Sequence, residues 1–292
     1  MVTESTTQQS EATPTLPGPL VDTDWLAAHL GSVVVLDASI APHLPDGEAI
    51  PGARPFDLDG AFSAPGDLPH TMPGAEQFSE ALRSLGIDDG DALVVYDAAG
   101  LYSAPRAWWM LRAAGLAVAV LDGGLPAWKT AGHPVQDTAP TYDGPSGNVS
   151  VELDPDAFVD ADTVAMLLAD PGTAVVDARS RDRFAGEAPE PRPGLRAGHM
   201  PGSRNLPFTE LQRDGRFLPV EELRRVFDAE IGDRRLVTSC GSGVTASVVA
   251  LAATLTGNRE VAVYDGSWAE WGRPDAPEVE RPVETGAEGT GA

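Results

Sequence analysis

Residues 236–255 read LVTSCGSGVTASVVALAATL. A short apolar run ends just before Cys240, three small residues follow the cysteine, and an apolar run with helical spacing begins at Val244. The pattern predicts a buried strand, a tight loop and a helix, a typical unit of α/β proteins. In such a unit, the backbone N–H groups of the loop and the positive end of the helix dipole point at the residue that ends the strand. We therefore expect the sulfur of Cys240 to lie in an anion-binding loop.

Similar apolar runs recur along the chain, and segments of helical periodicity separate them. This alternation predicts an α/β fold in which mostly parallel sheets are flanked by helices. The six candidate strands are residues 33–36, 92–96, 117–121, 173–176, 236–239 and 261–264.

The second three strands look like copies of the first three. Four pairs of segments match, namely VVVLDA with AVVDA, IPGARPF with MPGSRNLPF, LVVYD with LVTSC, and LDGGLPAW with YDGSWAEW. A repeat this long indicates two sibling domains rather than a solenoid. Composition then predicts a disordered tail at 1–19, a first domain at 20–135, a Pro- and Gly-rich linker at 136–155, a second domain at 156–275 and a mobile tail at 276–292.

The composition of the chain excludes several classes of function. The 292 residues include 20 Lys and Arg against 44 Asp and Glu, and the resulting net charge of −24 argues against nucleic-acid binding. No run approaches the ~20 apolar residues of a membrane span, and residues 1–19 do not resemble a signal peptide, so we expect a cytoplasmic protein with no membrane partner. One cysteine and five scattered histidines exclude an internal disulfide and a Cys-based metal cage, and we expect neither a metal nor an organic cofactor.

The two copies differ at one chemically important position, because Asp97 stands where the second copy has Cys240. Chemistry is therefore expected in the second domain, where the loop would stabilise a thiolate or persulfide. The alternative is a small buried cysteine with a packing role only. A cysteine phosphatase needs an arginine about six positions after the cysteine, where this chain has Ala246, and two-cysteine redox chemistry lacks a second cysteine.

A cluster of arginines gives an independent indication of the ligand. The stretch from 179 to 204 is net positive in an acidic chain, and arginine binds pairs of oxygen atoms on a carboxylate or sulfur oxyanion. The alternative is that at least half of these side chains only form surface ion pairs. The six arginines are Arg179, Arg181, Arg183, Arg192, Arg196 and Arg204.

Together, these motifs resemble those of tandem-domain rhodanese-type sulfurtransferases, and the CGSGVT loop resembles that of the 3-mercaptopyruvate sulfurtransferases. The resemblance covers about residues 20–274 and implies two rhodanese-like domains, of which the first is catalytically silent and the second carries a persulfide-forming Cys240. It also implies an active-site loop whose uncharged residues favour mercaptopyruvate over thiosulfate. That loop consists of Cys240, Gly241, Ser242, Gly243, Val244 and Thr245.

The same resemblance assigns roles to residues outside the loop. It matches Arg183 and Arg192 to the arginines that bind the small anionic sulfur donor, and it implies a proton relay of Ser242, His70 and Asp59. The implied acceptor is a thiol such as reduced thioredoxin, or cyanide. Two alternatives stay open: a thiosulfate sulfurtransferase that uses the same persulfide, and a non-catalytic rhodanese-like binding module.

Overall fold

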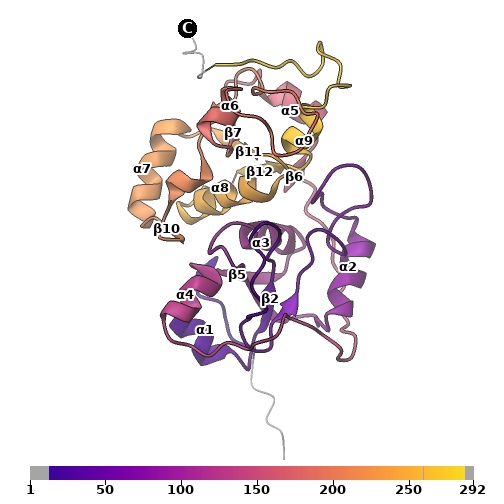
Figure 1. Cartoon of the computed structure of the whole chain (residues 1–292), viewed down its shortest axis with the longest axis vertical. Helices are drawn as coiled ribbons and strands as arrows, with labels where there is room; N and C mark the ends of the chain where they lie inside the picture. Colours follow the sequence, from indigo (N-terminus) through magenta and orange to yellow (C-terminus); the bar gives the residue numbers. More distant parts are fainter. Residues whose placement is uncertain (1–12, 259, 287–292) are drawn as a thin grey trace, which may run out of the picture.

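The first domain is built on a five-stranded parallel sheet. In the computed structural model, which describes residues 13–258 and 260–286, the strand order is β1-β5-β4-β2-β3, and every neighbouring pair is parallel. Helices flank the sheet (Figure 1). The elements are β1 (Leu20–Val21), α1 (Thr23–His29), β2 (Val34–Asp37), β3 (Arg54–Pro55), α2 (Ala75–Ser84), β4 (Ala92–Tyr96), α3 (Ala104–Ala113), β5 (Ala117–Leu121) and α4 (Gly124–Thr130).

The second domain repeats this architecture. Its parallel sheet has the order β6-β12-β11-β7-β8, which is the order of the first sheet with each strand replaced by its counterpart. An antiparallel pair, β9 with β10, is added. The elements are β6 (Phe158–Val159), α5 (Ala161–Leu167), β7 (Thr173–Asp177), α6 (Arg181–Phe184), β8 (Arg204–Asn205), the 3₁₀ helix η1 (Phe208–Leu211), β9 (Gln212–Arg213), β10 (Arg216–Phe217), α7 (Val220–Glu230), β11 (Arg235–Ser239), α8 (Val244–Leu255), β12 (Val261–Tyr264) and α9 (Ser267–Trp271).

The predicted α/β class and the duplication are confirmed, and all six predicted strands are present within a residue of their expected limits. The sequence does not predict the two-residue strands, because so short a segment shows no periodicity; these are β1, β3, β6, β8, β9 and β10. The long strands are buried on both faces, as in all five residues of β4, which is why they read as continuous apolar runs.

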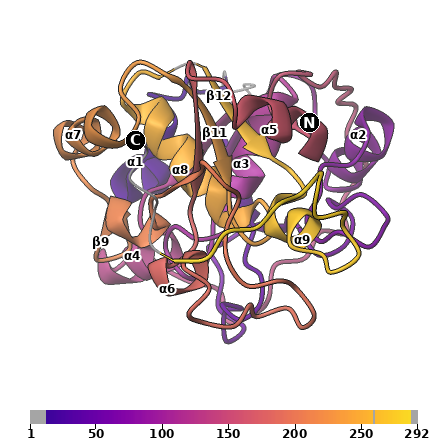
Figure 2. The same cartoon turned by 90° about the horizontal axis from the view of Figure 1, so that it is seen from above.

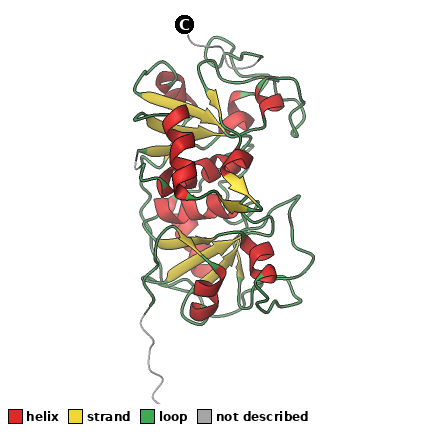
Figure 3. Cartoon of the chain, turned by 90° about the vertical axis from the view of Figure 1, so that its left-hand side faces the viewer, coloured by secondary structure: helices red, strands yellow, loops and turns green. Residues whose placement is uncertain are grey.

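The two domains meet through α3 and α8. These helices contact each other between the two sheets (Figures 1 and 3). Seen from above, they lie near the centre of the molecule, while α7 and α2 lie at opposite sides (Figure 2). Residues 244–253 of α8 are all buried, as expected for a helix that is apolar on every side. One hydrophobic cluster therefore extends through both domains, including Trp109 of α3 and Leu251 of α8.

Several segments outside the domains are fixed by hydrogen bonds. In the predicted linker, Gln136 pairs with Ala49, and the Val149 N–H donates to the Ile87 carbonyl. Within 276–286, part of the predicted mobile tail, Glu284 pairs with His199. Residues 1–12 and 287–292 of the predicted tails lie outside the described residues. The described helices include none with the length and apolarity of a membrane span.

Candidate active site

Cys240 lies at the carboxyl end of β11, in the loop that leads into α8. Its side chain is only 2% exposed, and the Ser242 N–H points at its sulfur with an N–S distance of 3.5 Å. The backbone of Cys240 is fixed by the start of α9, because its N–H donates to Ser267 Oγ at 3.2 Å and its carbonyl accepts from the Trp268 N–H at 2.9 Å. The loop ends at Gly243 in the left-handed region, with φ of +78°. The predicted strand–loop–helix unit is therefore present, with an amide aimed at the sulfur.

The equivalent loop of the first domain is filled by its own aspartate. The Asp97 carboxylate is fully buried and accepts hydrogen bonds of 2.8–2.9 Å from the backbone N–H groups of Ala99, Gly100, Tyr102, Ser103 and Ala104. The loop after β4 thus directs five amides at an anion, and that anion is the carboxylate of the first domain itself.

Ser242, His70 and Asp59 form a hydrogen-bonded chain across the domain boundary. His70 Nδ1 lies 2.9 Å from Ser242 Oγ, and His70 Nε2 lies 2.8 Å from Asp59 Oδ1. His70 has φ of +60°, an uncommon conformation for a residue with a side chain. Burial lowers the pKa of His70, the neighbouring Asp59 opposes this, and the charges of Arg192 and Arg106 lower the pKa further.

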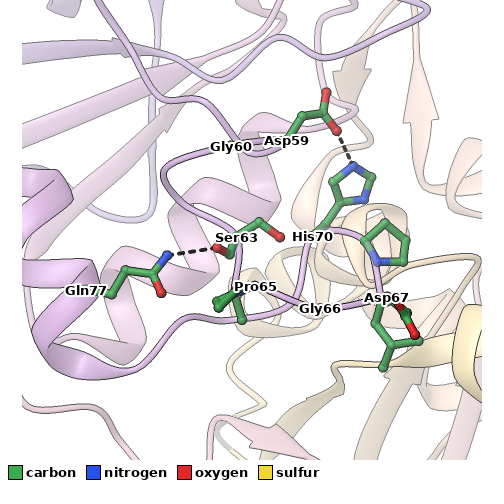
Figure 4. A pocket seen from close by; sticks show the side chains of 11 residues that line it. Asp59, Gly60, Ser63, Pro65, Gly66, Asp67, His70 and Gln77 are labelled. Atoms are coloured by element: carbon green, nitrogen blue, oxygen red, sulfur yellow. Dashed lines mark hydrogen bonds and ion pairs between the residues drawn. The ribbon is translucent and has the colours of Figure 1, made fainter.

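Two hollows meet at His70. One, of about 660 Å³, is lined by the 59–70 loop and Gln77 (Figure 4), whose side chain donates to the Ser63 carbonyl at 2.9 Å. The other, of about 380 Å³, contains Cys240. Only the second brings the sulfur together with cationic groups, so it is the candidate substrate cavity.

Arg183 and Arg192 lie over the cysteine loop. A Cβ atom at Gly241 would be 3.3 Å from Arg183 Nη2 and 3.7 Å from Arg192 Nη1. Arg183 is bound to Glu190 with an Nη2–Oε2 distance of 2.6 Å, whereas Arg192 donates to Ser242 Oγ at 3.4 Å and has no ion pair among the described residues. Arg192 is therefore the cation best placed to take a bound anion.

The other arginines of the cluster have structural partners. All of the six except Arg192 pair with acids, but only three of them, Arg181, Arg196 and Arg204, do so outside the cavity and at least partly exposed, which is half of the set, as expected for surface ion pairs. Arg179 is fully enclosed, with its guanidinium 2.7 Å from Asp177 and stacked 4.2 Å from the ring centre of Trp268. The remaining partners are Glu210 for Arg181, Glu190 for Arg183, Glu278 for Arg196 and Glu230 for Arg204.

The structure places most of the predicted site residues around this cavity and adds one that the sequence did not reveal. Gly241, Ser242, Val244 and Thr245 line it, while Gly243 makes the turn beneath them. Tyr102 of the first domain also lines it, and burial and the neighbouring Cys240 raise the pKa of its phenol, which stays an O–H donor. Tyr102 follows Asp97 at the distance at which Thr245 follows Cys240, so aligning the two copies would have revealed it.

Comparison with known proteins agrees with this geometry. A family model for the rhodanese-like domain matches residues 22–131 and 160–273. The chain belongs to the rhodanese family. Two tandem rhodanese-like domains are therefore confirmed, as the sequence predicted.

The most similar rhodanese-family proteins include named sulfurtransferases. The 3-mercaptopyruvate sulfurtransferase of Escherichia coli (strain K12) is 39% identical over 88% of this chain and 96% of its own. The thiosulfate/3-mercaptopyruvate sulfurtransferase 1, mitochondrial, of Arabidopsis thaliana is 39% identical over 89% of this chain and 77% of its own. Among solved structures, SseA from Escherichia coli, described as a 3-mercaptopyruvate sulfotransferase with the rhodanese fold, matches with a TM-score of 0.76 and 36% identity, covering 86% of this chain and 99% of SseA.

Proposed function

We propose that this chain is a sulfurtransferase that moves sulfane sulfur from 3-mercaptopyruvate to a thiol acceptor through a persulfide on Cys240. One observation carries the proposal: Cys240 faces a cavity that also holds Arg183, Arg192 and the Ser242–His70 pair. The names of the relatives support the reaction class and the donor.

The first half-reaction transfers one sulfur atom to the enzyme. The Cys240 thiolate attacks the sulfur of the donor, an S–S bond forms and the C–S bond of the donor breaks. The electron pair of that bond leaves with the carbon skeleton as the enolate of pyruvate, which takes up one proton. Ser242, His70 and Asp59 deliver this proton, because they form one hydrogen-bonded chain that ends in the cavity.

The arginines bind the donor and offset its charge. Arg192 takes the donor carboxylate, and Arg183, held in place by Glu190, takes the adjacent keto oxygen. Both cations also stabilise the negative charge that develops on the enolate. In the second half-reaction a thiolate attacks the outer sulfur of the persulfide, which releases the Cys240 thiolate. We propose a small thiol or a protein dithiol such as reduced thioredoxin as acceptor, cyanide as an assay acceptor, and the cytoplasm as the location.

Mass spectrometry of the intact protein tests the persulfide. After exposure to 3-mercaptopyruvate without acceptor, the protein should gain the mass of one sulfur atom, and Cys240→Ser should gain none. A Cys240→Ser protein that still took up sulfur would overturn the assignment of the persulfide to Cys240. A wild-type protein that took up none would leave the chain as a rhodanese-like binding module.

Donor kinetics separate the two sulfurtransferase readings. Thiosulfate is the alternative donor. Its sulfonate group is doubly charged together with the outer sulfur, but the loop positions Gly241 and Ser242 carry no positive charge to bind it. We expect kcat/KM to favour mercaptopyruvate and Arg192→Ala to lower kcat/KM for it by roughly 100-fold. Arg181→Ala, which removes an arginine outside the cavity, is the matched control and should keep full activity. A preference for thiosulfate would reverse the assignment.

A further inference from the structure

Arg106 is a buried cation that crosses the domain boundary. It belongs to α3 of the first domain, is fully buried, and forms an ion pair with Asp265 of the second domain at an Nη2–Oδ1 distance of 2.6 Å. Its guanidinium carbon lies 4.7 Å from the ring centre of Phe158 on β6. A Cβ atom at Gly243 would be 2.9 Å from Arg106 Nη1, so the guanidinium lies directly against the turn that follows Cys240 and Ser242.

Arg106 and Asp265 together fix the segment that carries His70. Arg106 Nη2 also donates to the His70 carbonyl at 2.6 Å, and the second oxygen of Asp265 accepts from the Met72 N–H at 2.8 Å. The ion pair thus binds the backbone of the 70–72 segment at two points. One of these bonds is to His70 itself and the other lies two residues after it, so both hold the chain where the positive φ of His70 needs external support.

The cost of burying this arginine indicates that it does more than fill space. Its Nε and Nη1 have no hydrogen-bond partner in the part of the chain that the structure describes. A buried ion pair with unpartnered donors is a weak source of stability, because desolvation cancels much of the attraction, but it fixes the orientation of the groups that it binds. Here those groups belong to the His70 segment, which the ion pair holds beside the cysteine loop.

We propose that Arg106, paired with Asp265, is a positioning residue that holds His70 against Ser242 across the domain boundary. The inference rests on the proposed function, in which His70 relays a proton. The positive charge of Arg106 has a second effect. Arg106 and Arg192 both disfavour protonation of His70, whereas the negative charge of Asp59 favours it. Asp265 faces Arg106 and partly offsets its charge.

Three variants and one direct measurement test this role. NMR titration of labelled histidines, with the His70 signal assigned through His70→Gln, reports the pKa of His70 without relying on activity. In Arg106→Gln we expect that pKa to rise, and kcat to fall by about 10- to 100-fold with KM for the donor little changed, since Arg183 and Arg192 remain. Arg106→Lys should restore part of both effects. Arg112→Gln, on the same helix but stacked on Trp109 away from the cavity, is the matched control and should leave both unchanged.

Asp265→Asn provides the second test if Arg106→Gln does not fold. Removing the carboxylate leaves the charge of Arg106 uncompensated, so the pKa of His70 should fall. A folded Arg106→Gln or Asp265→Asn protein with the wild-type pKa of His70 overturns the proposal, even where kcat has dropped. Sulfur uptake separates the two hypotheses: if Cys240→Ser still gains sulfur the proposed function fails, whereas wild-type behaviour of Arg106→Gln removes only the positioning role.

Discussion

At the scale of single residues, the proton relay depends on His70 being uncharged when it meets Ser242. The ring is buried between two partners, and burial is the main cause of its lowered pKa. Asp59 favours the protonated ring, but its side chain is 60% exposed, and water screens its charge. Burial and the two arginines therefore outweigh Asp59 and keep the ring neutral. A neutral ring can accept a proton at one nitrogen and donate one from the other.

This lowered pKa predicts how stability depends on pH. Between the pKa of native His70 and the unfolded value of about 6.5, the unfolded chain binds more protons than the native one, so the free energy of unfolding decreases as the pH falls. Below the native pKa this loss is complete. Urea denaturation of the wild type and of His70→Gln from pH 8 to pH 5 should show a steeper decline for the wild type. Parallel curves would show that His70 titrates alike in both states.

At the scale of elements, one loop design serves two purposes. After β4 it encloses the Asp97 carboxylate with five amides, and after β11 it presents Cys240 to a cavity. The two loops differ in the residue that directly follows the strand and in length, because the helix begins seven residues after Asp97 but four residues after Cys240. In the turn after Cys240, Gly243 abuts the Arg106 guanidinium.

Two glycines with similar backbone angles can separate strain from crowding. Gly243 has φ of +78° and Gly115 has φ of +75°, but a Cβ atom at Gly115 would meet nothing within 4 Å. Gly115→Ala should cost about 1 kcal/mol in unfolding free energy from backbone strain alone. Gly243→Ala should cost about 2–3 kcal/mol, because the new methyl group would also displace Arg106, and it should slow persulfide formation. Equal losses in the two variants would mean that Arg106 moves aside freely.

At the scale of the whole molecule, the sequence predicted the strands and the duplication, which show as repeated or alternating patterns. It did not predict contacts between residues that lie far apart in the chain. The six long strands were predicted from apolar runs, and the catalytic role of Cys240 was predicted because the first copy has Asp97 at the same position. The partnership of His70 with Ser242 came from family resemblance, since the two residues are 172 positions apart. Tyr102 could have been found by aligning the two copies. Arg106 lies on a domain that the sequence marks as silent, and no local pattern shows that α3 faces α8.

The shared core predicts that the two domains unfold together. A single hydrophobic cluster contains Trp109 and Leu251, and α3 and α8 would each expose a largely apolar surface if one domain opened alone. Exposing that surface is unfavourable, so the loss of one domain should destabilise the other. Scanning calorimetry should therefore show one transition with equal calorimetric and van't Hoff enthalpies. Ala250→Asp, which places a charge in the buried core around α8, should lower the Tm of that single transition. Two resolved transitions would mean that each domain is stable without the other. The site between the domains could then open without the unfolding of either one.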